Sequence, residues 1–413
     1  MKHDSASPPP TALSFEEADV LLSISDAFIQ EAVQMSRHYI GCSRHPSAID
    51  ATRWKRVAHV RDLTMYQERR GRARLGTKRK LGSRLAETDF PDDQTKLLPA
   101  TLMLGTFIGD LESVMFGLQT LTEDATRLRA SYLGDTYVDE RLLAVPLEYP
   151  SYRDPLRSCT LKWRGLRRGA KVASGQFFSS RVTETVYIES SGVTVLSPGE
   201  RIGYELLQSV DVPGFSGASK TEKPHAIISY CYVYRQASSN VVEVFMLGST
   251  SRDGVSIGGA IAKMHSLDQL ERCAELKKLA WLLKTSQPTL TNSQESGSCA
   301  ECFRSFGRWP HRAERQCSVC DDHVCTSCIK YRHMRFALPD RLKIIRSKLA
   351  FCGRCVRRAN ETSPLTVATF DAMEHDDEFD LNTIESSSPL LSHGSKWGSQ
   401  YLDDLAMTIL GDL

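Results

Sequence analysis

Eight of the twelve cysteines form four CxxC pairs within 57 residues, and no other residues in this chain are better placed to do chemistry. Their order is Cys299-x2-Cys302-x14-Cys317-x2-Cys320-x4-Cys325-x2-Cys328-x23-Cys352-x2-Cys355. Zinc prefers four tetrahedral ligands, and a two-residue gap lets both sulfurs of a pair reach one ion. The eight thiols therefore predict two closed structural zinc sites, with no open position for a catalytic water. The alternative is disulfides, which the crowding and the lack of an apolar signal core in residues 1–20 disfavour.

Spacing alone does not decide which pairs share an ion. The four residues between Cys320 and Cys325 leave little room for sequential pairing, and the array resembles a cross-brace, in which alternate pairs share an ion. That arrangement gives zinc 1 to Cys299, Cys302, Cys325 and Cys328, and zinc 2 to Cys317, Cys320, Cys352 and Cys355. The three histidines of this region are not needed as ligands: His311, His323 and His333.

All-cysteine ligation at this spacing resembles the FYVE zinc finger, over residues 299–358, hereafter the finger. Phe306, four residues after the second cysteine, and the pair Leu338-Pro339 add to the resemblance. It implies two zinc ions and binding of phosphatidylinositol 3-phosphate on endosomal membranes. The lipid-reading stretch departs from that family, because its histidines and following arginine are replaced in Glu314-Arg-Gln-Cys-Ser-Val-Cys-Asp321. We therefore expect a degenerate phosphoinositide pocket and little preference for that lipid.

Charge is distributed unevenly around the finger, although the whole chain carries only +2. The finger holds fourteen Lys or Arg against five Asp or Glu, whereas residues 359–413 hold eleven acids and one base. Basic residues near an anionic membrane contribute about 1 kcal/mol each. A solvated surface kept for solubility is the alternative interpretation. The residues expected to contact membrane or lipid are Arg308, Trp309, Arg312 and Arg315.

The segment before the finger must supply the larger fold. Its order is helices, a strand-like stretch, a helix, about six short apolar-alternating segments and a long closing helix, which is typical of an α+β fold. We expect helices over 14–40 and from Asp50, strands from Leu98 to Leu247, and a closing helix over 257–283. Ser266-Leu-Asp-Gln269 is a capping-box pattern and predicts a restart of that helix near His265.

This order resembles a START-like helix-grip domain, together with the stretches TRWKRVAHVRDLTMYQERR and YELLQSVDVPG. The resemblance implies an antiparallel sheet wrapped on a long C-terminal helix and a cavity able to enclose one lipid; a filled core on the same fold is the alternative. The expected parts are a flexible leader (1–13), a START-like domain (14–284) with a basic loop (68–84), a linker (285–298), the finger (299–358) and an acidic, disordered tail (359–413).

Enzymatic function is not expected. Gly254-Val-Ser256-Ile-Gly258 matches the GxSxG nucleophile motif, but that motif belongs to parallel α/β folds. No phosphate-binding or dinucleotide-binding fingerprint is present. With 41% apolar and 25% charged residues and no apolar run of membrane-spanning length, the chain is predicted to be a soluble globular protein.

We expect a non-catalytic, zinc-binding adaptor associated with lipid or membrane, intracellular and either cytoplasmic or peripheral to endosomal membranes, with a nuclear location left open. The partners expected are a lipid in the cavity, an anionic membrane surface and a protein bound by the tail. One alternative is a protein-interaction scaffold that uses the finger and the tail. A less favoured alternative is a nucleic-acid-associated protein, suggested by Lys78-Arg79-Lys80.

Overall fold

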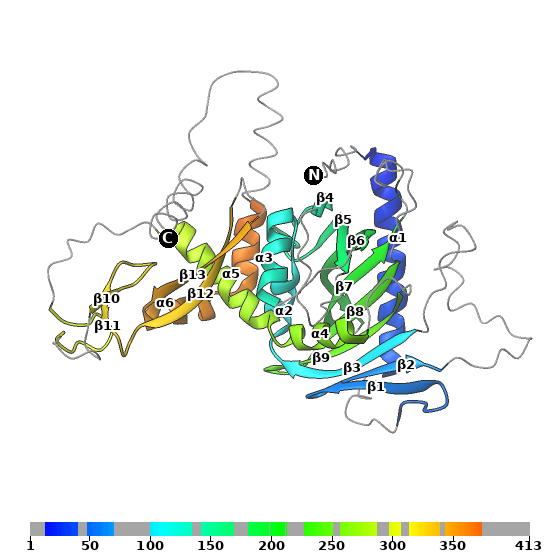
Figure 1. Ribbon diagram of the computed structural model, residues 1–413, viewed down its shortest axis with the longest axis horizontal. Helices are drawn as coiled ribbons and strands as arrows, with labels where there is room; N and C mark the ends of the chain where they lie inside the picture. The colour runs from blue at the N-terminus through cyan, green and yellow to red at the C-terminus, as the bar shows by residue number, and fades with distance from the viewer. Residues whose placement is uncertain are drawn as a thin grey trace, which may run out of the picture.

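The computed structural model shows an antiparallel sheet with helices on both sides and the finger at one end (Figure 1). It describes residues 13–39, 48–69, 100–133, 142–168, 181–197, 199–210, 212, 227–250, 257–286, 297–306, 314–338 and 343–373. Most of the expected leader, basic loop and linker therefore lies outside the described residues, as does the GxSxG serine. No helix in this part of the chain is both long and apolar enough to cross a membrane.

The nine-stranded sheet has the order β1-β2-β3-β9-β8-β7-β6-β5-β4, and every neighbouring pair is antiparallel. The six consecutive strands β4 to β9 form a meander, and its last strand, β9, pairs with the earlier strand β3. This confirms the expected α+β class with a large antiparallel sheet. The strands are β1 (Trp54–Val60), β2 (Leu63–Glu68), β3 (Thr101–Ile108), β4 (Leu142–Glu148), β5 (Ser158–Arg168), β6 (Arg181–Leu196), β7 (Glu200–Ser209), β8 (Ile228–Ser238) and β9 (Val241–Thr250).

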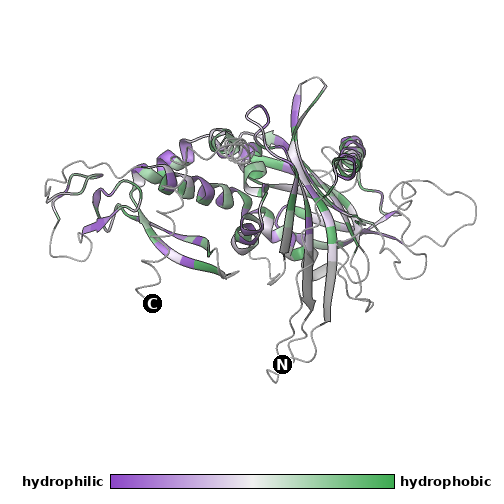
Figure 2. Cartoon of the chain, turned by 90° about the horizontal axis from the view of Figure 1, so that it is seen from above, coloured by the Kyte–Doolittle hydropathy of each residue, from purple (hydrophilic) through white to green (hydrophobic). Residues whose placement is uncertain are grey.

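Both faces of the sheet are covered, by different helices. Successive side chains of a strand point to opposite faces, and in β8 Val233 packs with the cluster under helix α1 (Phe15–Ser36), whereas Tyr234 packs with the cluster under the opposite helices. The opposite face is covered by α2 (Leu111–Leu118), α4 (Ile257–Leu267) and the first half of α5 (Leu270–Thr285). In the view from above, hydrophobic residues are prominent along the sheet and the helices beside it (Figure 2).

Local sequence explains where these helices begin. Ser14 and Glu17 form a reciprocal capping box at the start of α1, and the Asp110 side chain accepts from the Ser113 amide at the start of α2. Helices α2 and α5 pass very close to each other: a Cβ added to Gly117 would lie 2.6 Å from the Leu270 carbonyl oxygen. The glycine is therefore required by close packing. Helix α3 (Glu123–Leu133) follows α2 and reaches the finger.

The finger is built from two hairpins and one helix. Strands β10 (Glu314–Gln316) and β11 (His323–Cys325) form a short hairpin, and β12 (Lys330–Leu338) pairs along its whole length with β13 (Lys343–Phe351). Helix α6 (Gly353–Glu361) begins at Cys352, whose sulfur accepts from the Cys355 amide. The paired cysteines therefore lie at strand ends, in or beside turns or, for Cys352 and Cys355, at the start of α6.

Two expectations about helices were wrong. The stretch from Asp50 forms the strand β1, because its β-branched and aromatic residues pair with β2 across the Arg61-Asp62 turn. The closing helix is broken as predicted, but the capping box does not form: the Ser266 hydroxyl donates to the Lys263 carbonyl, and α5 begins after Gln269, which makes no side-chain cap.

The described structure continues past residue 359, where we expected the acidic tail to begin. After α6, residues 364–373 form another helix. Val367 and Ala368 are buried in the α+β core, and the Phe370 ring meets Trp281 edge to face at 5.9 Å. These apolar residues explain why the segment packs despite the acidic composition that follows it. Residues 374–413 lie outside the described residues.

Candidate metal centres

The structure brings the eight paired cysteines together in two groups of four. Within each group the sulfurs lie within 4.8 Å of one another. These are the same two sets that the cross-brace resemblance implies. All eight are free thiols rather than disulfides. The first group is Cys299, Cys302, Cys325 and Cys328, and the second is Cys317, Cys320, Cys352 and Cys355.

The distances between sulfurs suit a tetrahedral ion. The Cys302 and Cys325 sulfurs lie 3.8 Å apart, and so do those of Cys320 and Cys352. Zinc–sulfur bonds of about 2.3 Å in a tetrahedron place the ligands about 3.8 Å from one another. Spacing and donor type therefore both fit zinc, and each group joins segments far apart in the sequence.

Backbone amides favour the thiolate form that a metal requires. The amide of Cys325 donates to the Cys299 sulfur at 3.3 Å, and that of Cys352 donates to the Cys317 sulfur at 3.2 Å. Burial opposes ionisation of Cys299, but amide donors, including those of Cys302 and Cys325, outweigh it and lower its pKa to about 6.

The turns that carry the first two pairs share a backbone feature. Phe303 follows Cys302 and has φ +58°, and Asp321 follows Cys320 and has φ +57°. In each turn the amide of the positive-φ residue donates to the carbonyl oxygen of the first cysteine of the pair. Phe303 donates to Cys299, and Asp321 donates to Cys317. L-residues pay about 1–2 kcal/mol for this left-handed conformation, so both turns are strained.

The finger shares its hydrophobic core with the second half of α5. Leu276, Leu279, Leu282 and Leu283 of α5 pack in one cluster with the buried cysteines and with Phe351. Tyr132 at the end of α3 packs at its edge. Leu279 and Leu282 have no exposed surface, so α5 belongs to both cores at once.

Polar contacts reinforce this junction. Arg332 of β12 donates to the Glu275 carboxylate of α5 at 2.9 and 3.0 Å. Lys278 donates to the carbonyl oxygens of Asn360 and Thr362 at 3.4 and 3.3 Å. The finger is therefore held against α5 at both its hairpin and its C-terminal end.

The residues expected to contact lipid are only partly described. Arg315 lies exposed on β10, where its guanidinium donates to the neighbouring Glu314 carbonyl. The Gln316 side chain donates to the Asp321 carboxylate at 3.4 Å, so these two side chains are hydrogen-bonded to each other. Arg308, Trp309 and Arg312 lie outside the described residues, as does His311. His323 lies beside Glu314 and belongs to neither sulfur group.

A buried ion network lies on the face of the sheet that α2, α4 and α5 cover. Glu189 of β6 meets Lys162 at 3.0 Å and Arg129 at 2.9 Å, and Glu205 of β7 lies 3.5 Å from Lys263. Burial opposes ionisation of Glu189, but Arg129 and Lys162 outweigh it and hold its pKa well below the usual 4.5. Glu189 is therefore ionised at neutral pH although it is buried.

Sequence reasoning missed this network. Lys162 alternates with Leu161 and Trp163, so the local pattern places it on the polar face of its strand, whereas the fold buries that face as well and a buried charge requires a partner. Tyr234 completes the arrangement by donating its hydroxyl to Glu205 at 3.1 Å. The partner Arg129 comes from α3, and only the fold reveals it.

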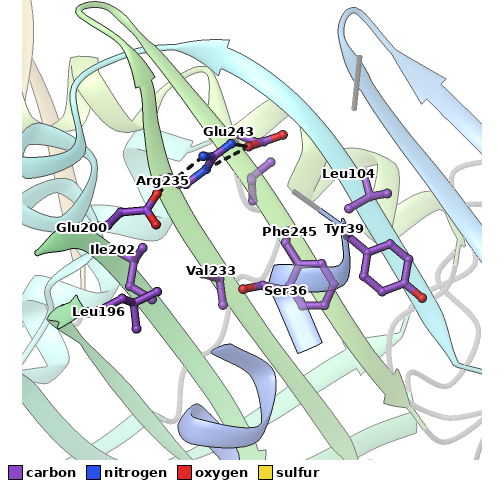
Figure 3. A pocket seen from close by; sticks show the side chains of 11 residues that line it. Ser36, Tyr39, Leu104, Leu196, Glu200, Ile202, Val233, Arg235, Glu243 and Phe245 are labelled. Carbon is purple, nitrogen blue, oxygen red and sulfur yellow. Dashed lines mark hydrogen bonds and ion pairs between the residues drawn. The ribbon is translucent and has the colours of Figure 1, made fainter. Parts of the chain in front are cut away.

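A small cavity of about 20 Å³ lies on the opposite face of the sheet, between α1 and strands β3, β7, β8 and β9. Figure 3 shows Arg235 lying between Glu200 and Glu243 at its rim, with Tyr39 and Phe245 opposite. The volume suffices for about one water, which needs roughly 10–15 Å³. This cavity is too small to enclose a lipid.

Comparison with known proteins gives fold-level resemblances of low score. No family model matches the chain, and no curated protein matches it. Human StAR-related lipid transfer protein 5 is 10% identical, covering 62% of this chain and 96% of that one at a TM-score of 0.36. Human STARD10 is 8% identical, covering 56% of this chain and 76% of that one at a TM-score of 0.31. The lipid transfer and protein localization domain of human StarD13 (DLC2) is 11% identical, covering 57% and 96% at 0.31.

Proposed function

We propose that this protein is a non-catalytic, zinc-dependent adaptor that associates with lipid or membrane, built from a START-like domain and a FYVE-like finger. The observation that carries the proposal is the pair of four-cysteine groups, whose sulfurs have the spacing and chemistry of structural zinc. Binding of a structural metal contributes to the free energy of folding, so zinc would stabilise the finger and its packing against α5.

The metal part of the proposal is tested by native mass spectrometry of the purified chain. We expect two zinc ions per chain, because eight thiolates complete two tetrahedral shells. The same spectrum reports a retained lipid as added mass. One zinc ion or none in freshly purified, reduced protein would contradict the assignment.

Lipid binding by the α+β domain forms the second part of the proposal. It is supported by the six-strand meander followed by closing helices, which is the order expected for a helix-grip domain and places α4 and α5 on one face of the sheet. Met115, Val244 and Met264 fill the described interior on that face. Uptake of a lipid would therefore require the helices to move away from the sheet. Absence of co-purifying lipid, and of lipid transfer between vesicles, would favour the scaffold alternative.

Membrane association by the finger is proposed to depend on charge rather than on phosphatidylinositol 3-phosphate. The support comes from Arg315, Gln316 and Asp321, because only the first is a cation and the other two bond each other. We expect sedimentation with anionic vesicles that weakens with salt and differs less than tenfold between this lipid and phosphatidylserine at matched surface charge. A preference of tenfold or more would show that a specific pocket exists.

A further inference from the structure

A second, larger cavity opens where the finger meets the α+β domain. It has a volume of about 210 Å³ and lies between the end of α3, the start of α5 and the β12–β13 hairpin. That is many times the roughly 10–15 Å³ that one water needs. Its polar lining is contributed by both parts of the chain: Tyr132, Gln269 and Arg272 from the α+β domain, and His333, Arg335 and Arg346 from the finger.

The lining is strongly basic, and among the residues that the structure describes it includes no carboxylate. Three guanidiniums and one imidazole face the space. The nearby acids of α5 and its N-terminal turn have other partners: Glu275 accepts from Arg332, Glu271 accepts from the Asp110 amide, and Asp268 pairs with Arg61. Among the described residues, no ion pair with a carboxylate involves Arg272 or Arg346.

One of the three guanidiniums is held in place. Arg335 donates to the Ser131 hydroxyl at 2.8 Å and lies over the Tyr132 ring at 5.2 Å. The Tyr132 hydroxyl in turn accepts from the Arg335 amide at 2.9 Å. Burial and the facing cations Arg346 and Arg272 hold the pKa of Arg335 below its usual value. Like charges are therefore gathered here without internal neutralisation.

Arginine is suited to phosphate because its planar guanidinium donates two parallel hydrogen bonds to oxyanions. Gln269 also lines the cavity, and its side-chain amide is a neutral donor. We propose that this cavity binds a phosphorylated ligand, whose phosphate groups are contacted by Arg272, Arg335 and Arg346 together. The position differs from the stretch around Cys317 where the FYVE resemblance places lipid recognition, and the site exists only while the finger is docked on α5.

The site can be tested with the full-length zinc-loaded chain and inositol hexakisphosphate as the soluble probe, by calorimetry at physiological salt. The test variant is Arg272→Gln with Arg346→Gln, because both side chains are exposed and their loss leaves no core cavity. The control is Arg358→Gln, which removes one charge from an exposed finger position outside the cavity. Zinc content and thermal unfolding of each variant show whether it is folded.

We expect the wild-type chain to bind the probe, and the double variant to bind at least tenfold more weakly, about 1.4 kcal/mol. The control should stay within twofold. Equal weakening of binding in the control variant would overturn the proposal. So would a lack of measurable binding by wild type both to inositol hexakisphosphate and to the phosphorylated vesicles described next.

The second probe separates a free ligand from a lipid headgroup. Vesicles of phosphatidylcholine with a phosphatidylinositol bisphosphate are compared with vesicles carrying phosphatidylserine at the same surface charge. Binding to the phosphorylated vesicles alone, lost in the double variant, supports the headgroup as the source. Binding to the soluble probe, lost in the same way, supports a free ligand. Because zinc is counted separately, failure of this site leaves the metal proposal standing.

Discussion

The α+β domain and the finger reach a stable core by different means. In the domain, a nine-stranded sheet is buried on both faces, and clusters such as Leu102 with Val233 or Val244 with Met264 supply apolar surface. The finger has few such residues of its own, so eight cysteines and four leucines of α5 complete its interior. The finger thus has thiols of metal-ligand type and a helix of the neighbouring domain where a larger segment would have an apolar core of its own.

The strongest test of this difference is removal of one metal ligand. We expect Cys317→Ser to lower the zinc count from two to one and unfold the finger, because structural zinc contributes roughly 10–16 kcal/mol in small modules. Hydrogen exchange should rise in the finger and in the second half of α5, which shares its core, while β5 to β9 stay protected.

The matched control is Cys273→Ser. This buried cysteine lies outside both groups, and its thiol donates to the Gly117 carbonyl, as a serine hydroxyl can. It should keep two zinc ions. Loss of protection across the whole sheet in Cys317→Ser would mean that the two parts do not fold separately.

Within the α+β domain, the largest effect is expected from the buried ion network. Glu189→Gln removes the carboxylate that faces Arg129 and Lys162, and breaking a buried pair in this way costs about 3–5 kcal/mol. Glu112→Gln is the control, since its partner Arg201 is half exposed and such pairs contribute about 0–1 kcal/mol. Chemical unfolding of the domain measures both. Equal losses would contradict the assigned importance of the network.

The same residue predicts a pH dependence. The pKa of Glu189 is lower in the folded chain than its usual 4.5, so its stabilisation is present above that value and is lost as pH falls below it. The protection factors for hydrogen exchange in β5 and β6, which correct for the intrinsic pH dependence of exchange, should therefore decrease in wild type below about pH 4.5. The Glu189→Gln variant should not show this loss of protection below pH 4.5. The same pH dependence in the variant and the wild type would contradict the role assigned to Glu189.

A smaller effect on stability is expected from deleting one buried leucine, and the rate of zinc loss should differ between the core shared with the finger and the domain's own core. Leu279→Ala and Leu161→Ala both delete a fully buried leucine, at about 2–5 kcal/mol each. Leu279 lies in the cluster shared with the finger, and Leu161 lies under α1. Only Leu279→Ala should speed loss of zinc to a chelator. Equal rates of loss in both variants would show that α5 does not support the metal centres.

The smallest effect is expected at the strained turn of the first group. Phe303 is 82% exposed and has a positive φ, so Phe303→Gly removes strain without losing packing. We expect the finger to gain about 1 kcal/mol. Phe303→Ala keeps the strain and should gain nothing in thermal unfolding of the zinc-loaded chain. An equal gain in both variants would assign the effect to the aromatic ring.

Much of this architecture could be predicted locally. The strand formed by Thr101–Ile108 follows from a short apolar run with β-branched residues, and the class of the fold follows from the order of such segments. Local pattern failed at Trp54–Val60, where the pairing with β2 decides for a strand, and at Ser266, whose hydroxyl bonds within its own turn. In both places a contact made only in the folded chain outweighs a local preference.

The sequence by itself determined the candidate metal ligands, because the number, type and spacing of the cysteines single out eight thiols in four pairs. Tertiary structure decided what depends on distant segments. It brought Cys299 to Cys325 and Cys317 to Cys352. It also paired Arg129 with Glu189, and placed Arg272 opposite Arg335 and Arg346 around one cavity. Pairings between distant segments leave no local pattern, so only the packing of α3 and α5 against the sheet and the finger reveals them.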